Sequence, residues 1–275
     1  MAGFKVCLIL GLALGAEATK VQGSKLLRQE PHLKGSKIGS GAALVSALEF
    51  KHRLRICNAY PYAAAMDVYR GIDRLTGDSP MPYKKCKDFE TPLKPQDKLE
   101  FKVGDANAGT FSVSDLPNND AVLFLAIHRH DTLSTAVSFE SHVFANLLNA
   151  QVAIIDTYKG TARSLPEISD AAGGHGKRSE ELRFDSVVAV NPGAYDIALM
   201  SRDGAAKARG SLVALNRESY VVMRTGVEAQ QGPSYPEELV VYPQSDPAAL
   251  KSGAAIHTAM VSVFLAAVST MASTA

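Results

Sequence analysis

The chain has 275 residues, with 29 lysines and arginines against 28 aspartates and glutamates, and its formal net charge is +1. This balance gives no sign of a nucleic-acid partner, because proteins that bind nucleic acids concentrate positive charge on one face. The length suffices for one large domain or two small ones.

Residues 1–18 show the three parts of a cleavable export signal. Lys5 supplies a positive charge, residues 6–15 are apolar and uncharged, and residues 16–18 (AEA) place small residues where a signal peptidase requires them. The apolar run is too short to span a bilayer. We therefore predict cleavage after Ala18 and a protein that is periplasmic, secreted or displayed at the cell surface. A buried N-terminal helix or strand is the alternative interpretation.

Residues 19–49 form a leader rich in glycine and serine, in which basic residues have few acidic neighbours. These basic residues are Lys20, Lys25, Arg28, Lys34 and Lys37. Such a composition predicts a solvated segment with little order, because it offers few apolar groups to bury. Attraction to an anionic polymer or to a membrane surface is the alternative interpretation.

The cysteines predict one disulfide bond. Cys7 leaves with the export signal, so the mature chain keeps Cys57 and Cys86. In an oxidising compartment two remaining cysteines are expected to pair. Their bond would close a loop of about 29 residues and stabilise the fold by roughly 3–4 kcal/mol. The absence of a Cys-x-x-Cys motif favours a structural bond over a redox site.

Residues 50–149 are predicted to form a first β-sandwich domain. Its expected strands either alternate apolar and polar residues or are continuously apolar where both faces are buried. The alternating segments are 54–58, 66–69, 99–103 and 110–113, and the continuous segment is 121–127. The prolines in residues 77–97 indicate a loop or an edge strand. Residues 141–148 also fit a short helical turn.

Residues 150–243 are predicted to form a second, smaller β-sandwich domain. Short strands are expected at 151–155, 186–190, 195–200, 210–215 and 219–223. Residues 160–180, which contain a glycine-rich run, are expected to be a connector between domains. Short strands separated by polar turns predict an all-β protein with two antiparallel β-sandwich domains in tandem, rather than an alternating α/β fold.

The two halves also suggest an internal repeat. Each contains a strand, an asparagine turn, an aspartate-containing strand, and later a leucine and polar turn that lead into an apolar strand. The first half places these features at Asn58, 66–69 and 116–123, and the second places them at Asn191, 195–198 and 215–222. Two related sandwiches are one interpretation, and chance similarity between β-strands is the other.

Residues 244–275 form a weakly hydrophobic tail, of which 259–268 are the most apolar part. Three interpretations compete: a marginal membrane anchor, a lipid-anchor signal that is removed, and a short helix packed on the domain. Serine, threonine and alanine dilute the apolar run, so a short C-terminal helix is the leading interpretation.

No catalytic motif is found along the chain. Residues 173–179 (GGHGKRS) approach a phosphate-binding loop but lack the glycine needed at Ala171 and the serine or threonine needed at Arg178. No serine has the flanking glycines of a nucleophile elbow. The sequence therefore predicts a protein that is not an enzyme, with no catalytic residues and no cofactor.

A pair of histidines raises the question of a metal. His128 and His130 lie two residues apart at the end of the apolar strand, where a period of two places both on one face. A third ligand would have to come from Asp131 or His142. Strand ends that run into solvent commonly carry such residues without a ligand, so no metal site is predicted. A metal-dependent hydrolase is kept as a third functional hypothesis.

Two stretches resemble known families. Residues 55–71 (RICNAYPYAAAMDVYRG) are similar to the opening of a bacterial extracytoplasmic β-sandwich family of unknown function, with Asn58 and Asp67 at that family's spacing. Residues 150–226 resemble the alginate biosynthesis protein F family. The matching segments are 150–160 (AQVAIIDTYKG), 186–200 (SVVAVNPGAYDIALM) and 213–223 (VALNRESYVVM).

The second resemblance implies two small β-sandwich domains and a non-catalytic role beside membrane-associated acetyltransferase machinery. Our leading hypothesis is therefore an extracytoplasmic adaptor in the O-acetylation or export of an alginate-like exopolysaccharide. Its expected partners are proteins of a polysaccharide-modifying complex and the anionic polysaccharide, with a membrane contact only through the tail. A cell-surface or matrix binding module, suggested by the leader and the tail, is the alternative.

Overall fold

The computed structural model describes residues 50–145, 149–171 and 178–250 of the chain. The predicted export signal, the leader up to residue 49 and the tail from residue 251 lie outside the described residues. Among the residues that are described, no helix is long and apolar enough to cross a membrane.

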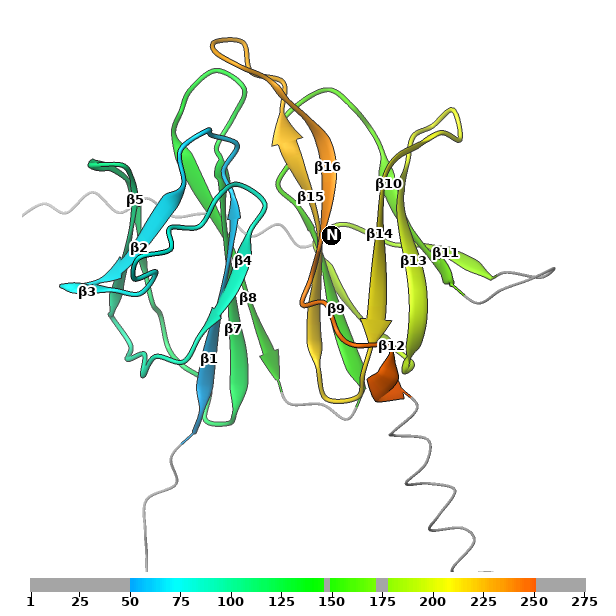
Figure 1. Ribbon diagram of the computed structural model, residues 1–275, viewed down its shortest axis with the longest axis horizontal. Helices are drawn as coiled ribbons and strands as arrows, with labels where there is room; N and C mark the ends of the chain where they lie inside the picture. Colours follow the sequence, from blue (N-terminus) through cyan, green and yellow to red (C-terminus); the bar gives the residue numbers. More distant parts are fainter. Residues whose placement is uncertain (1–49, 146–148, 172–177, 251–275) are drawn as a thin grey trace, which may run out of the picture. The chain divides into compact units, whose positions relative to one another are not determined.

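The described residues fold into sixteen β-strands (Figure 1). The first eight are β1 (His52–Ala59), β2 (Met66–Arg70), β3 (Asp73–Arg74), β4 (Cys86–Phe89), β5 (Lys98–Val103), β6 (Ala106–Ser112), β7 (Ala121–Arg129) and β8 (Val137–Ala145). The second eight are β9 (Ala150–Asp156), β10 (Leu165–Asp170), β11 (Ser179–Glu181), β12 (Ser186–Val190), β13 (Gly193–Met200), β14 (Ala206–Ala214), β15 (Ser219–Val227) and β16 (Tyr235–Tyr242).

These strands form four sheets that reveal an internal duplication. The first sandwich, strands β1–β8, has the sheets β3-β2-β5-β6 and β4-β1-β7-β8. The second sandwich, strands β9–β16, has the sheets β11-β10-β13-β14 and β12-β9-β15-β16. Adding eight to each strand number of the first sandwich gives the strand order of the second. The prediction of an all-β, sandwich-like fold is confirmed, and the two sandwiches have the same topology.

The prediction of antiparallel sheets needs one correction. In each sandwich the two central strands of one sheet run parallel: β1 beside β7, and β9 beside β15. The other strand pairs of the described residues are antiparallel. After β1 the chain crosses to the opposite sheet for β2 and β3, returns as the antiparallel edge strand β4, crosses again for β5 and β6, and returns as β7 in the direction of β1. The second sandwich follows the same path from β9 to β15.

The duplication also corrects the predicted repeat. The structural counterpart of β1 is β9, so Asn58 corresponds to Asp156 rather than to Asn191. The two side chains make the same hydrogen bond, in which Oδ1 accepts from the backbone N–H two residues later. The donor is Tyr60 for Asn58 and Tyr158 for Asp156, and each bond is 3.0 Å long. The predicted match of residues 66–69 with 195–198 is also wrong, because the counterpart of β2 is β10 and not β13. The segments leading into β7 and β15 are counterparts, but the structural register differs by two residues from the predicted one.

Several strands, β3 and β16 among them, were not predicted from the sequence, and two further segments form strands where another structure was expected. Residues 160–180 were expected to connect the domains, but they contain β10 and the start of β11 and belong to the second sandwich. Residues 141–145, which also fitted a helical turn, are the end of the edge strand β8. Local composition misled in both places, because pairing with a neighbouring strand overrides weak local preference.

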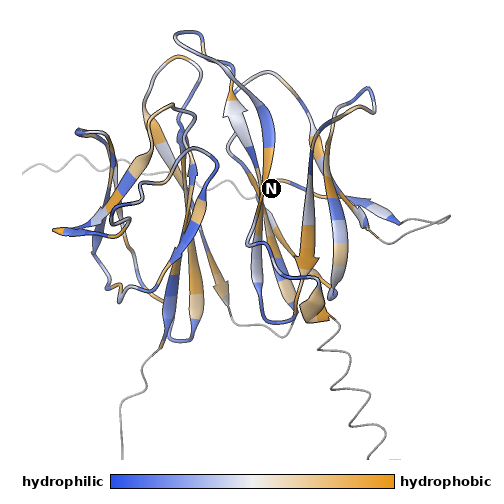
Figure 2. Ribbon diagram, in the orientation of Figure 1, coloured by the Kyte–Doolittle hydropathy of each residue, from blue (hydrophilic) through white to orange (hydrophobic). Residues whose placement is uncertain are grey.

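Three apolar clusters hold the layers together, and apolar residues gather along the facing strands in Figure 2. One fills the first sandwich and includes Ile56, Phe101 and Leu125. Another fills the second sandwich and includes Ile154 and Tyr220. The third lies between the sandwiches and joins the sheet β4-β1-β7-β8 to the sheet β12-β9-β15-β16. We call this contact between the two sheets the seam.

Candidate functional site

The seam is apolar at its centre. The first sandwich contributes Cys57, Ala59, Cys86, Phe124, Ala126 and Phe144, and the second contributes Ala153, Ile155, Val221 and Met223. Alternation along each strand explains which residues face the seam: Phe124 and Ala126 of β7 do, whereas Leu125 points to the opposite face and enters the core of the first sandwich. Burying a side chain as large as Phe or Met contributes about 1.5–3 kcal/mol, so this cluster holds the sandwiches together.

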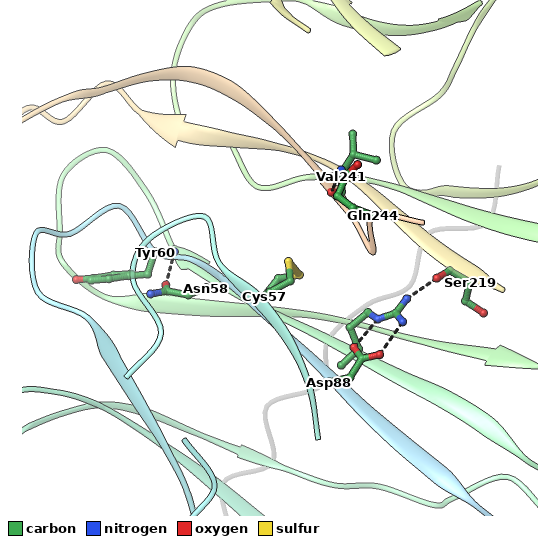
Figure 3. The surroundings of a disulfide bond; sticks show 9 residues. Cys57, Asn58, Tyr60, Asp88, Ser219, Val241 and Gln244 are labelled. Atoms are coloured by element: carbon green, nitrogen blue, oxygen red, sulfur yellow. Dashed lines mark hydrogen bonds and ion pairs between the residues drawn. A yellow bond between two sulfur atoms is a disulfide. The ribbon is translucent and has the colours of Figure 1, made fainter. Parts of the chain in front are cut away.

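A buried arginine crosses the seam. The Arg55 side chain is 1% exposed and forms two hydrogen bonds with Asp88 of β4, from Nε to Oδ1 at 2.8 Å and from Nη2 to Oδ2 at 2.9 Å. Its Nη1 donates to the backbone carbonyl of Ser219 in the second sandwich. The guanidinium also lies over the ring of Tyr242, 5.1 Å from its centre. Figure 3 shows Asp88 and Ser219 on either side of these contacts.

The predicted disulfide bond forms in the same sheet. Cys57 and Cys86 are direct cross-strand partners in β1 and β4, and their sulfur atoms are bonded (Figure 3). Both residues belong to the apolar cluster of the seam, with exposed fractions of 0% and 4%. The bond therefore fastens the edge strand β4 to the centre of its sheet, next to the Arg55–Asp88 pair.

Polar contacts complete the seam at the end where β1 and β15 finish. The Tyr83 hydroxyl lies 3.3 Å from Oγ1 of Thr225, and Thr225 donates to the backbone carbonyl of Ala59. The rings of Tyr83 and Tyr235 meet edge to face at 5.4 Å. Lys84 Nζ lies 2.7 Å from Glu238 Oε1. Burial raises the pKa of Tyr83 to about 12, because the phenolate would lose its hydration there.

This pKa predicts how the protein responds to alkali. Tyr83 has a higher pKa folded than unfolded, so its contribution to stability is complete below about pH 10 and is lost as the pH rises toward 12. We expect the free energy of unfolding to fall less steeply over this range in the Tyr83→Phe variant than in the native protein. Urea unfolding at a series of pH values measures both slopes. Tyr62→Phe, at an exposed position, is the matched control, and equal slopes for all three proteins would contradict the prediction.

A groove of about 580 Å³ opens at the other end of the seam, where β1, β7, β9 and β15 begin. Both sandwiches line it. Its charged side chains are the cations Lys51, Arg53 and Arg217 and the carboxylates Glu90, Asp120 and Glu218. Its apolar lining includes Val122 and Phe144, which are cross-strand partners in β7 and β8. We call this feature the groove.

The duplication places the groove where equivalent parts of the two sandwiches meet. The pair Arg53–Val122 of β1 and β7 corresponds to the pair Gln151–Ser219 of β9 and β15, and all four residues line the groove. In the same register Asp120 corresponds to Arg217. Equivalent positions therefore carry different chemistry, and the groove presents an asymmetric set of groups to a ligand.

The histidine of the groove, His52, forms hydrogen bonds with the backbone. Nε2 of His52 lies 3.0 Å from the carbonyl oxygen of Pro117 and 3.2 Å from that of Asn119, in the turn that leads to β7. Two carbonyl oxygens can only accept, so this nitrogen carries the proton and donates it. His52 thus holds the turn in place, and this nitrogen is not free to act as a base.

The histidines considered for a metal do not come together with further ligands. His128 is a buried residue of β7, and its Nδ1 lies 2.8 Å from the carbonyl oxygen of Arg129. His130 lies beyond the end of this strand, and its Nδ1 lies 2.8 Å from Oγ of Ser138. Asp131 accepts hydrogen bonds from Ser134 in its own turn. Within the described ranges, no group of three His, Cys, Asp or Glu side chains is placed to hold a metal ion.

His128 instead lies near a carboxylate of the neighbouring strand β8. Its Nε2 lies 3.8 Å from Oε1 of Glu140, and this contact holds the pKa of Glu140 below its ordinary value. Burial lowers the pKa of His142, which lies on the same strand as Glu140. Of the glycine-rich segment 173–179, residues 173–177 lie outside the described residues.

Sequence reasoning found the disulfide pair but missed Arg55, Asp88 and the groove. Arg55 did carry a signal, because it lies between Leu54 and Ile56 in a strand whose residues from Leu54 to Ala59 are all buried. A buried arginine requires a partner with its own charge or hydrogen-bond acceptors. The groove left no such local signal, since its residues come from six separate stretches of the chain.

Comparisons with known proteins add little to this description. No family model and no curated protein matches the chain. Among solved structures, the chain is similar to a crystal structure of CBMbc (family CBM26) from Eubacterium rectale Amy13K in complex with maltoheptaose. The sequence identity is 9%, the match covers 71% of this chain and 98% of that chain, and the TM-score is 0.24. A likeness of this degree carries no argument about function.

Proposed function

We propose that the protein is a non-catalytic extracytoplasmic adaptor in the O-acetylation or export of an alginate-like exopolysaccharide. The observation that carries the proposal is the groove, to which both sandwiches contribute charged and apolar groups at the end of a shared seam. A site assembled from two joined domains is a common place for recognition. The occupied His52 favours binding at this site over acid–base chemistry.

Two further observations support this proposal. The resemblance to the alginate biosynthesis protein F family falls on residues 150–226, which cover β9 to β14 and most of β15. The Cys57–Cys86 bond suits an oxidising compartment outside the cytoplasm, where disulfide bonds persist. The alternative of a cell-surface or matrix module rests on residues 19–49 and 252–275, which lie outside the described residues.

Capture of partners from the native host tests the adaptor function. We expect a tagged, exported protein, crosslinked in intact cells, to recover components of a polysaccharide O-acetylation or export complex by mass spectrometry. We also expect deletion of the protein to lower the acetyl content of the secreted polymer, and the full chain to restore it. A chain without residues 2–18 should remain inside and fail to restore the acetyl content.

Two results would reject the adaptor function. One is recovery of no acetylation or export component above the level of an unrelated exported protein with the same tag. The other is an unchanged polymer, in both amount and acetylation, when the protein is absent. The capture experiment uses the native groove, so its outcome does not depend on which ligand the groove takes.

A further inference from the structure

The charges of the groove are balanced, with three cations facing the same space as three carboxylates. Arg53 lies 3.7 Å from Asp88, and Oδ1 of Asp120 accepts a hydrogen bond from the backbone N–H of Lys51. The other charged side chains, those of Lys51, Arg217, Glu90 and Glu218, have no ion-pair or hydrogen-bond partner among the described residues. Charges of both signs are thus available to a ligand.

The groove also has an apolar floor. Val122 and Phe144 face the seam side by side, and Phe144 is 1% exposed. Phe50, whose exposed fraction is 40%, stands at the start of the described chain and lines the same groove. Polar side chains of Thr91 and Ser219 lie among them. A ligand that fills this groove must therefore offer an apolar group as well as charges.

We propose that the groove binds an extended peptide segment of a protein partner, in which acidic and basic side chains flank an apolar one. The proposal rests on the adaptor function and specifies which partner component the groove takes. Charge complementarity selects this ligand: the segment's basic groups face Glu90 and Glu218, its acidic groups face Lys51 and Arg217, and its apolar side chain packs against Phe50 and Val122.

Other classes of ligand match these groups less well. A polymer that carries only negative charge would place its carboxylates beside Glu90, Asp120 and Glu218, and like charges at an interface cost several kcal/mol. A neutral sugar would bring no counter-charge to the four side chains without a partner. A peptide has charges of both signs and also a direction, which the asymmetric groove can distinguish.

Selection from a display library of short random peptides tests the proposal on the full mature protein. We expect the enriched peptides to combine acidic and basic residues around an apolar one. The Lys51→Glu/Arg217→Asp variant should bind a selected synthetic peptide at least about tenfold more weakly. Both positions are exposed, and aspartate tolerates the left-handed backbone of residue 217, where φ is 64°.

A second variant with the same net charge provides the control. Lys98→Glu/Lys207→Glu changes exposed lysines of β5 and β14, which belong to the two sheets that do not form the seam, and neither lysine lines the groove. It should bind the selected peptide as tightly as the native protein does. Equal weakening by both variants would show a general charge effect and reject the proposal. Circular dichroism of each variant confirms that the fold is retained.

The remaining outcomes also decide the matter. No enrichment over the unselected library, or enrichment of peptides whose binding is unaffected by Lys51→Glu/Arg217→Asp, would overturn the proposal. Binding of polygalacturonate that this variant abolishes, without peptide binding, would assign the groove to a carboxylated polysaccharide instead. In each of these cases partner capture by the native protein still decides the adaptor function by itself.

Discussion

Replacing Arg55 with leucine is expected to lower the free energy of unfolding by about 3 kcal/mol. The change removes the charge that faces Asp88, two hydrogen bonds to that carboxylate, and the bond to the Ser219 carbonyl across the seam. Breaking a buried ion pair by removing one partner costs about 3–5 kcal/mol. We expect the lower end of this energy range, because the Asp88 side chain is 24% exposed and water can reach its carboxylate.

Equilibrium unfolding in urea, with the disulfide bond intact, measures this effect. Arg53→Ala is the matched control, because Arg53 approaches the same Asp88 at 3.7 Å but its side chain is 45% exposed. An exposed pair of this kind is worth about 0–1 kcal/mol. A loss below about 1 kcal/mol for Arg55→Leu would show that the seam does not depend on this contact.

A double variant separates the two parts of the effect. Arg55→Leu/Asp88→Leu removes the unpaired carboxylate as well, and replacing both members of a buried pair with apolar residues is often neutral or stabilising. We expect it to be more stable than Arg55→Leu alone. If the double variant were as unstable as the single one, the bond to Ser219 and the contact with Tyr242 would account for the loss.

A strand was predictable from the sequence wherever its own residues showed a clear apolar pattern. Residues 121–127 were expected to form a buried central strand, and Leu125, Ala126 and Ile127 there are almost completely buried. The apolar pattern identifies such a strand because both of its faces are covered. The pairing of Cys57 with Cys86 was also predictable, since the third cysteine, Cys7, lies in the predicted export signal.

Strand pairing was less predictable, because alternation fixes which residues share a face but not which strands are neighbours. Asn58 was therefore aligned with Asn191, although its counterpart is Asp156. An aspartate and an asparagine are interchangeable in this turn, because each needs only one oxygen that accepts from the N–H two residues later. The chemistry of the turn, rather than residue identity, was the signal to follow.

The candidate site was hidden for a related reason. Lys51 and Arg217 are separated by most of the chain, and only the packing of one sandwich on the other brings them to a common groove. Each looks like an ordinary solvated residue in its own segment. The seam that assembles them depends in turn on Arg55, which binds across it, and on the bond that fastens β4.

The second large effect is expected from that bond. Replacing both Cys57 and Cys86 with alanine should lower the free energy of unfolding by about 3–4 kcal/mol, the loop-closure value for a separation of 29 residues. Alanine is preferred to serine, because both positions are buried among apolar side chains and a hydroxyl would lack a partner. Urea unfolding of the variant and of the oxidised native protein measures the difference.

The position of the bond predicts which part of the protein responds. β4 is an edge strand of four residues, held to β1 by the disulfide and by the Arg55–Asp88 pair, and Glu90 just beyond it lines the groove. Hydrogen exchange in the double-alanine variant should therefore increase most in β4, and less in β16 on the other side of the seam. Uniform exchange across both sandwiches would show instead that the bond stabilises the protein only through its unfolded state, and that the groove wall does not depend on it.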